Sequence, residues 1–230
     1  MRSIMHRKAL ASRRFCSIEP VIVAVLRCVR VAVASNEGAY MKQFSSDGAV
    51  VGAPLENLLA RRRAPDNLEP LQGVGVYAYF LRMADALPSI ATDESGILYV
   101  GMTEAGLDAR NHFNHKHSGF STFRRSLGAI LKEDLSLRAL PRSAGSSKSN
   151  VRCYRFDEKG EAALTEWMRG NLLIAQVEVE GDVATREDEL ITELQPPLNL
   201  KGWSNPQAPQ VKALRAACVR EAELARATLR

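Results

Sequence analysis

The chain has 230 residues, of which 46% are hydrophobic and 25% charged, a composition typical of a soluble globular protein. No run of eighteen apolar residues is present, which argues against a membrane-spanning helix. The net charge of +5 resides in residues 1–40, which hold seven Lys or Arg and two Asp or Glu, whereas the remainder carries 24 of each sign. The overall charge therefore says little about the partner of the folded part.

The four cysteines have neither C-x-x-C spacing nor the Cys/His spacing of a zinc site. A disulfide framework is not expected in a chain of this size. We therefore expect reduced thiols and a cytoplasmic protein.

Residues 1–70 are interpreted as an N-terminal extension and linker that is partly disordered. Residues 1–40 are rich in arginine and contain the broken apolar run VIVAVLRCVRVAVA. This composition is compatible with a transit peptide and equally with a translation start at Met41. The segment APLENLLARRR predicts one short helix, and Pro, Asp and Asn residues follow it as a linker.

From Gly73 onward, the apolar residues follow patterns that predict strands and helices. Residues 74–82 and 97–101 predict two buried strands, and pairing them as a hairpin is the economical interpretation. The segment TEAGLDARNHFNHK then predicts a helix with Thr103 as its candidate N-cap.

The segment STFRRSLGAILKEDL predicts a helix, since apolar residues from Phe123 to Leu131 recur on one face. Arg124, Arg125 and Lys132 fall away from this face and are expected to point to solvent or to a ligand. Residues 101–155 as a whole carry ten Lys or Arg against four acidic residues. This local excess suits a polyanion-binding face, and an ordinary solvated surface explains it equally well.

Further elements complete a small α/β fold. They are a polar loop at 139–150, a helix at EKGEAALTEWMRGN, a strand at LLIAQVEVEG, a helix at TREDELITELQPPLN and an amphipathic helix at about 207–228. A capping-box pattern at Thr185-x-x-Asp188 opens the fourth of these elements. The expected fold is a three-stranded mixed or antiparallel sheet flanked by helices, because three strands are stable only when helices cover them.

Several short motifs, taken in order, resemble the GIY-YIG nuclease superfamily. They are GVY at 75–77, YVG at 99–101, Arg110, Glu187 and Asn199. The segments YVGMT and GLDAR resemble the second motif of the family with one extra residue before the arginine. The resemblance spans residues 73–201, and we interpret 71–204 as the nuclease domain and 205–230 as a separate C-terminal helix.

The ending EDELITELQPPLN selects Glu187 as the family glutamate rather than Glu189 or Glu193. Glu187 stands three residues before Leu190 and twelve before Asn199, as the resemblance requires. Twenty-one residues separate Tyr77 from Tyr99, which indicates an enlarged hairpin loop.

The resemblance implies phosphodiester hydrolysis with one divalent metal, Mg²⁺ or Mn²⁺. Glu187 suits the metal because one carboxylate can hold Mg²⁺ and leave positions for water and phosphate. Arg110 suits the phosphate, since its planar fork matches two phosphate oxygens. Tyr77 and Tyr99 would position or deprotonate the attacking water. Tyr79, on the same strand face as Tyr77, is the internal competitor.

Asn199 would anchor the phosphate or the backbone of the metal site without adding charge. Three histidines follow Arg110, and the family often has a catalytic histidine there. Among His112, His115 and His117 we favour His115, with an exposed helix end as the alternative interpretation.

Nucleic-acid contacts are expected around the segment SGFSTFRRSL. The candidate residues are Lys116, Ser121, Thr122, Arg124 and Arg125. Hydroxyls and free N–H groups before a helix suit phosphates. A plain N-cap with solvated arginines explains the same segment.

The leading hypothesis is a metal-dependent endonuclease that hydrolyses phosphodiester bonds in DNA, with branched or damaged DNA among the candidate substrates. The alternative is a nucleic-acid-binding module on the same scaffold that does not cleave. No membrane partner is expected.

Overall fold

The structure is a computed structural model that describes residues 54–115, 117–145 and 147–228. The arginine-rich segment, its apolar run and Lys116 lie outside the described residues. In the part of the chain that is described, no helix is both long and apolar enough to cross a membrane.

The described residues form a three-stranded antiparallel sheet, which confirms the predicted fold class. Its strands are β1 (Gly75–Leu81), β2 (Ile97–Thr103) and β5 (Leu172–Glu178), in the order β2–β1–β5. Every residue of the central strand β1 is buried. This full burial explains why β1 reads as a continuous apolar run rather than as an alternating one.

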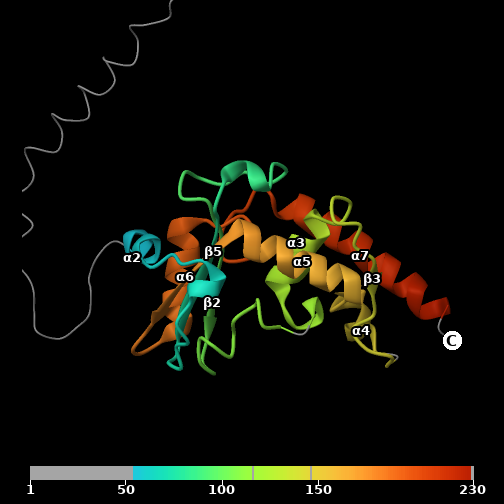
Figure 1. Cartoon of the computed structure of the whole chain (residues 1–230), viewed down its shortest axis with the longest axis horizontal. Helices are drawn as coiled ribbons and strands as arrows, with labels where there is room; N and C mark the ends of the chain where they lie inside the picture. Colours follow the sequence, from blue (N-terminus) through green and yellow to red (C-terminus); the bar gives the residue numbers. More distant parts are fainter. Residues whose placement is uncertain (1–53, 116, 146, 229–230) are drawn as a thin grey trace, which may run out of the picture. The chain divides into compact units, whose positions relative to one another are not determined.

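Helices cover both faces of this sheet (Figure 1). They are α2 (Pro54–Ala60), α3 (Thr122–Ile130), α5 (Glu158–Asn171), α6 (Val183–Leu194) and α7 (Ala208–Thr228). On one face, Val76 and Phe80 of β1 share a core with Leu58 of α2 and Leu190 of α6. On the other face, the tyrosines of β1 share a core with side chains of α3, α5 and α7. The sheet is thus the middle of three layers, the arrangement that a small sheet needs for stability.

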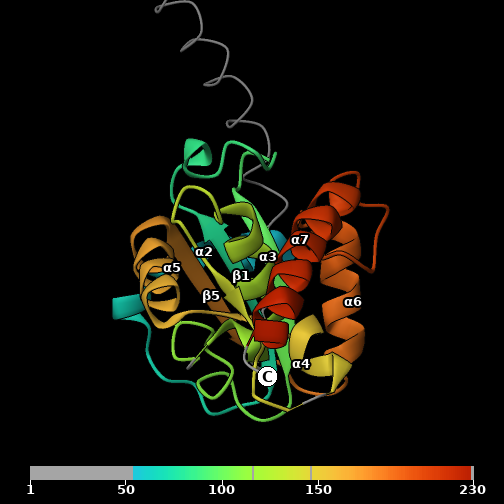
Figure 2. The same cartoon turned by 90° about the vertical axis from the view of Figure 1, so that its right-hand side faces the viewer.

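Smaller elements complete the domain. They are η1 (Pro65–Asn67), η2 (Ala84–Ala86), η3 (Ser118–Phe120), β3 (Ala139–Leu140), α4 (Lys148–Arg152) and β4 (Arg155–Phe156). The expected polar loop at 139–150 therefore contains β3 and the start of α4. Helix α7 packs against α3 and β3, and Figure 2 shows it running beside α3. Val211, Cys218 and Ala222 of α7 are buried in this contact.

The hairpin loop between β1 and β2 is anchored rather than free. Leu87 and Ile90 within it are buried, and Ala91 exchanges two hydrogen bonds with the side chain of Gln207, at 2.9 and 2.7 Å. The long separation of the two tyrosine motifs is therefore accommodated by a loop that packs onto the core.

The predicted helix at TEAGLDARNHFNHK is wrong. Strand β2 continues to Thr103, and a chain of turns follows it. The Thr103 hydroxyl accepts a hydrogen bond from the backbone N–H of Ala105 at 3.1 Å, and Gly106 has φ +100°. A φ in this region favours glycine and interrupts a helix. Arg110 consequently stands on a turn and not on a helix.

The helix α6 begins earlier than its sequence pattern predicts. Asp182 is the N-cap, and its carboxylate accepts hydrogen bonds from the N–H groups of Ala184 and Thr185. The first turn of α6 is thereby fixed, and Glu187 lies in the turn that follows.

Candidate active site

The hairpin register places the tyrosines on one face of the sheet. Tyr77 is opposite Gly101 and Tyr79 is opposite Tyr99, with an irregularity after Tyr79. Residues directly opposite in an antiparallel pair share a face. The ring centroids of Tyr77 and Tyr99 are accordingly 6.4 Å apart, and those of Tyr77 and Tyr79 are 6.0 Å apart.

Tyr77 and Tyr79 differ in what their hydroxyls contact. Tyr79 is fully buried, its ring is stacked on Phe123 at 4.4 Å, and its hydroxyl accepts the backbone N–H of His112 at 3.2 Å. Tyr77 instead places its hydroxyl 2.9 Å from Nε2 of His112. Tyr79 therefore serves the core, and Tyr77 is the tyrosine of this strand whose hydroxyl meets a side chain able to carry a proton.

Gly101 makes room for the Tyr77 ring. A Cβ atom at this position would lie 2.5 Å from the Tyr77 hydroxyl oxygen. The glycine of the YVG motif is thus required by close approach of a side chain on the neighbouring strand.

His112, rather than His115, contacts a predicted catalytic residue. Only 1% of His112 is exposed, and burial lowers its pKa well below 6.5, with further lowering from His115 and Arg110. Its ring is therefore neutral at neutral pH. The His115 ring centroid is 5.0 Å from that of His112, so the histidine that we favoured lies beside the tyrosine contact and not in it.

His112 is one of the three histidines that the sequence offers, although the sequence interpretation favours His115. In a helix, residues 110 and 112 would point to different sides. Here the turns, with N–H groups of Arg110 and Asn111 bonded three residues back, bring both toward Tyr77. The signal available in the sequence was its position two residues after the arginine of the motif.

Arg110 is exposed on its turn, and its guanidinium acts on the Tyr77 hydroxyl. Burial raises the pKa of Tyr77 above 10, and the charge and hydrogen bonding of Arg110 oppose that rise. Tyr99 is a neutral phenol as well, because burial raises its pKa. The charge of Arg110 also acts on Glu187. Tyr77 and Tyr99 are thus neutral phenols beside an exposed cation, Arg110.

Glu187 is half-buried, and its carboxylate faces the same region. Burial raises its pKa above 4.5, the neighbouring Asp188 raises it further, and the backbone of Met102 and the charge of Arg110 lower it. Met102 lies on β2 next to Gly101, so Glu187 of α6 sits at the strand that carries Tyr99. The two carboxylates of residues 187 and 188 make this edge negative, which favours a bound cation.

Asn199 holds the backbone of β2. Its Oδ1 accepts the N–H of Val100 and its Nδ2 donates to the carbonyl of Val100, each at 2.9 Å. Only 7% of the residue is exposed. Both ends of the amide are occupied by the strand residue that follows Tyr99, so Asn199 positions the site by fixing this strand.

The expected outward direction of Arg124 and Arg125 is wrong. Arg124 has no exposed surface, and its Nη2 lies 2.9 Å from the Glu161 carboxylate on α5. The guanidinium of Arg125 donates to the carbonyls of Ser118 and Gly119. Helix α5 covers the side of α3 on which Arg124 lies, and the Arg124 guanidinium also lies 2.9 Å from the Thr165 hydroxyl of α5. Neither arginine is therefore kept as a nucleic-acid contact.

Ser121 and Thr122 are both predicted either to cap the helix or to contact a phosphate, and the structure distinguishes the two residues. Ser121 is buried and acts as the N-cap of α3, accepting the N–H of Arg124 at 3.0 Å. Thr122 is exposed at the first position of the helix. Ser121 is thus an N-cap residue, whereas Thr122 is exposed enough to contact a ligand.

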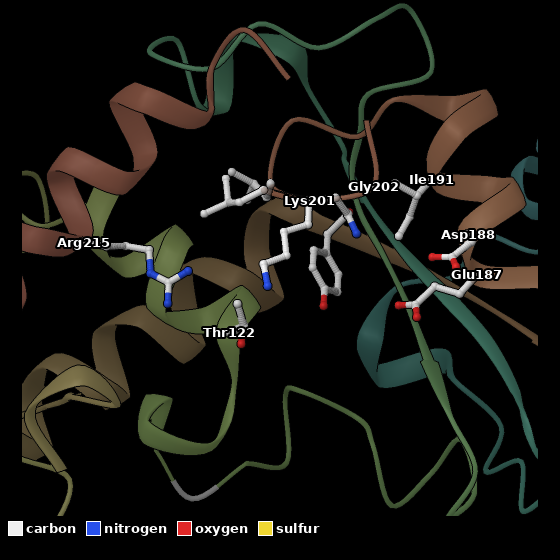
Figure 3. Close-up of a pocket in the computed structure, with 11 residues that line it drawn as sticks. Thr122, Glu187, Asp188, Ile191, Lys201, Gly202 and Arg215 are labelled. Carbon is white, nitrogen blue, oxygen red and sulfur yellow. The ribbon is translucent and has the colours of Figure 1, made fainter. Parts of the chain in front are cut away.

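A cavity of about 450 Å³ adjoins these residues. Glu187 and Asp188 enter it from α6, and Thr122 of α3 and Arg215 of α7 enter from the opposite side, with Lys201 between them (Figure 3). Tyr99 and Asn199 also line it. No group of three or more His, Cys, Asp or Glu side chains suited to a metal occurs within the described ranges.

The three-layer α/β domain thus brings two strand tyrosines, a turn arginine and a helix glutamate together, and Tyr99 and Glu187 of this set line the cavity. The family model of the GIY-YIG catalytic domain matches residues 75–218, more than half of the chain. The chain belongs to this family. The match extends beyond Asn199 into α7, so it includes the helix that carries Arg215. Neither the curated proteins nor the solved structures gave a match to the chain.

Proposed function

We propose that the protein is a metal-dependent endonuclease that hydrolyses phosphodiester bonds in DNA. The observation that carries the proposal is that side chains far apart in sequence meet at a single site. The ring centroids of Tyr77 and Tyr99 are 6.4 Å apart, and the charges of Arg110 and Glu187 act on the pKa of both hydroxyls. Hydrolysis of a phosphodiester needs a positioned water and neutralised phosphoryl oxygens, and these four side chains suit those tasks.

Glu187 would hold the metal ion, with Asp188 adding negative potential. The donor set fits Mg²⁺ or Mn²⁺, because Mg²⁺ is usually bound by one or two carboxylates and keeps several waters. The raised pKa of Glu187 indicates a carboxylate whose charge is not compensated by the protein alone. When bound, a divalent ion supplies charge neutralisation at the phosphate and at the leaving oxygen.

Tyr77 and His112 would form the proton path. Neutral His112 can accept the Tyr77 O–H at Nε2 across 2.9 Å, which assigns its own proton to Nδ1. The Tyr77 oxygen also takes hydrogen bonds from Arg110 and Tyr99, and the attacking water would take the place of one of them. As the water attacks phosphorus and the P–O bond to the leaving oxygen breaks, the proton of the water would pass to the Tyr77 oxygen while the phenolic proton passes to His112. The leaving oxygen would depart as an alkoxide that takes a proton from solvent. Tyr77 need never become a free phenolate, which its raised pKa would oppose.

Arg110 would bind the phosphate. It is exposed and, among the described residues, has no carboxylate in ion-pair contact. An unpaired guanidinium at the mouth of the site can form a bidentate contact with two phosphoryl oxygens. The free thiols of Cys153 and Cys218 suit a reducing compartment, and we place the protein in the cytoplasm.

The proposal is tested by incubating the full chain with supercoiled plasmid, branched DNA and RNA in Mg²⁺, Mn²⁺ or EDTA. We expect nicked or linear DNA with metal, none with EDTA, and a loss of at least about a hundredfold in rate for Arg110→Ala. Arg220→Ala, on the exposed face of α7, is the control. Salt-dependent binding without cleavage of any substrate would overturn the proposal in favour of a binding module.

A further inference from the structure

The cavity beside Glu187 has a second charged wall that the proposed chemistry does not use. Lys201 and Arg215 line it, from the segment after Asn199 and from α7 respectively. Lys201 is exposed and Arg215 is half-buried. Within the described residues, neither side chain forms an ion pair with a carboxylate.

The wall formed by Lys201 and Arg215 is positive, and the buried residue next to Arg215 is another cation rather than a carboxylate. The buried Arg125 lies nearby, and burial lowers its pKa, with further lowering by the charges of Arg215 and Arg142. The acidic residues of the cavity, Glu187 and Asp188, stand on the opposite side (Figure 3). One cavity therefore has a negative side suited to a metal ion and a positive side suited to an anion.

Thr122 completes the positive side. Its Oγ1 accepts a hydrogen bond from Nη2 of Arg125 at 3.1 Å, so the hydroxyl proton remains available to donate. Arg125 is itself fixed by two backbone carbonyls, which holds Thr122 in place. A donor hydroxyl beside two cations is a set of groups that an acceptor-only ligand such as a phosphodiester would satisfy.

We propose that Lys201, Arg215 and Thr122 form a subsite for a second phosphate of the nucleic-acid strand, adjacent to the phosphate that is cleaved. The inference rests on the proposed function for the identity of the ligand. The cavity volume of about 450 Å³ falls within the range of about 300–1,000 Å³ typical of ligand sites, so the cavity has room for more than one small polar group.

The subsite gives α7 a function in the reaction. A strand held at two successive points cannot rotate about the scissile phosphate, and such fixing lowers the entropic part of the barrier. The cations of the subsite act on the backbone and not on base edges, so they contribute affinity and position without sequence preference.

The test measures binding and cleavage separately. Fluorescein-labelled single-stranded and duplex oligonucleotides are titrated with the full chain in EDTA over a series of salt concentrations. For the double variant K201Q/R215Q we expect affinity to fall roughly tenfold or more and the salt slope to fall by about 2, one for each lost phosphate contact. The control K159Q/R220Q removes two exposed charges outside the cavity and should behave as wild type.

R215K keeps the charge without the fork and should retain more affinity than R215Q, which separates phosphate binding from packing. Wild-type-like binding by K201Q/R215Q, with cleavage intact in the unmodified chain, would overturn the subsite alone. Loss of binding in that variant, when the unmodified chain cleaves nothing, would support the subsite and refute the nuclease. Absence of binding by the unmodified chain would refute both.

Discussion

The hydroxyl of Tyr77 lies over Gly101 on the neighbouring strand, where a Cβ atom would come within 2.5 Å of it. The two residues belong to the two short motifs that name the family, and the contact explains why both are needed. The glycine of one motif creates the space that the tyrosine ring of the other fills. The tyrosine is then close enough to His112 to share a proton.

Gly101→Ala should therefore disturb the position of the Tyr77 hydroxyl without removing any catalytic side chain. The added methyl displaces the Tyr77 hydroxyl from His112, so we expect cleavage to fall at least about a hundredfold, since a shift of about 1 Å has this effect. The free energy of unfolding should fall by about 1–3 kcal/mol, as in other overpacked cores.

Gly170→Ala is the matched control, because a Cβ there meets nothing within 4 Å. Gly170 lies in α5, where alanine should raise the free energy of unfolding by roughly 0.5–1 kcal/mol and leave cleavage unchanged. Cleavage at the wild-type rate by a folded Gly101→Ala chain would refute the role given to the contact.

The stability of the domain should depend on pH through His112. Its pKa in the folded chain is well below the ordinary 6.5, and that of His115 is lowered too. The unfolded chain takes up these protons near pH 6.5, whereas the folded chain does not. The free energy of unfolding should thus fall as pH falls below about 6.5.

Urea titrations from about pH 7.5 down to about pH 5 measure this slope, and His112→Gln should make it shallower. Glu187 has the opposite sign, because its pKa is raised on folding, but it acts nearer its ordinary value of 4.5. A slope unchanged by His112→Gln would contradict the burial of a neutral His112.

Arg124 should matter for stability and not for DNA binding. Its guanidinium is buried against Glu161, whose carboxylate also accepts the backbone N–H groups of Ser118 and Phe156. Arg124→Met leaves this buried carboxylate without its counter-charge, so the free energy of unfolding should fall by about 3–5 kcal/mol.

The exposed pair Arg186–Glu189 is the comparison for this prediction. Arg186→Gln should change the free energy of unfolding by less than about 1 kcal/mol. A stable Arg124→Met chain with a reduced salt slope in DNA binding would restore Arg124 as a phosphate contact.

The parts of this structure that the sequence predicted are those governed by local pattern. Helix α5 follows from its apolar spacing and end signals, and α3 does so as far as Ile130, five residues before the predicted end at Leu135. The direction of Arg124 could not be predicted in this way, because it depends on contacts with Glu161 and Thr165 of α5, 37 and 41 positions further along the chain. No helix forms at residues 103–115 for a local reason, the positive φ of Gly106, which apolar periodicity does not detect.

Asn199 shows a second limit. The family resemblance singles it out, but the sequence cannot say whether its amide contacts a phosphate or a backbone. In the structure, the amide makes two hydrogen bonds to the backbone of Val100, which lies 99 positions earlier in the sequence. Residues that position a site in this manner are selected for geometry and have no chemical signature of their own.

Glu187 is the residue on which the proposed cleavage depends most directly, and one comparison of two variants tests its role. Cleavage of plasmid in Mg²⁺ is measured for Glu187→Gln and for Glu193→Gln, an exposed glutamate six residues later in the same helix. We predict that Glu187→Gln loses cleavage by about a thousandfold while it still binds DNA, and that Glu193→Gln cleaves as wild type. Cleavage by Glu187→Gln at the rate of the unmodified chain would contradict the account.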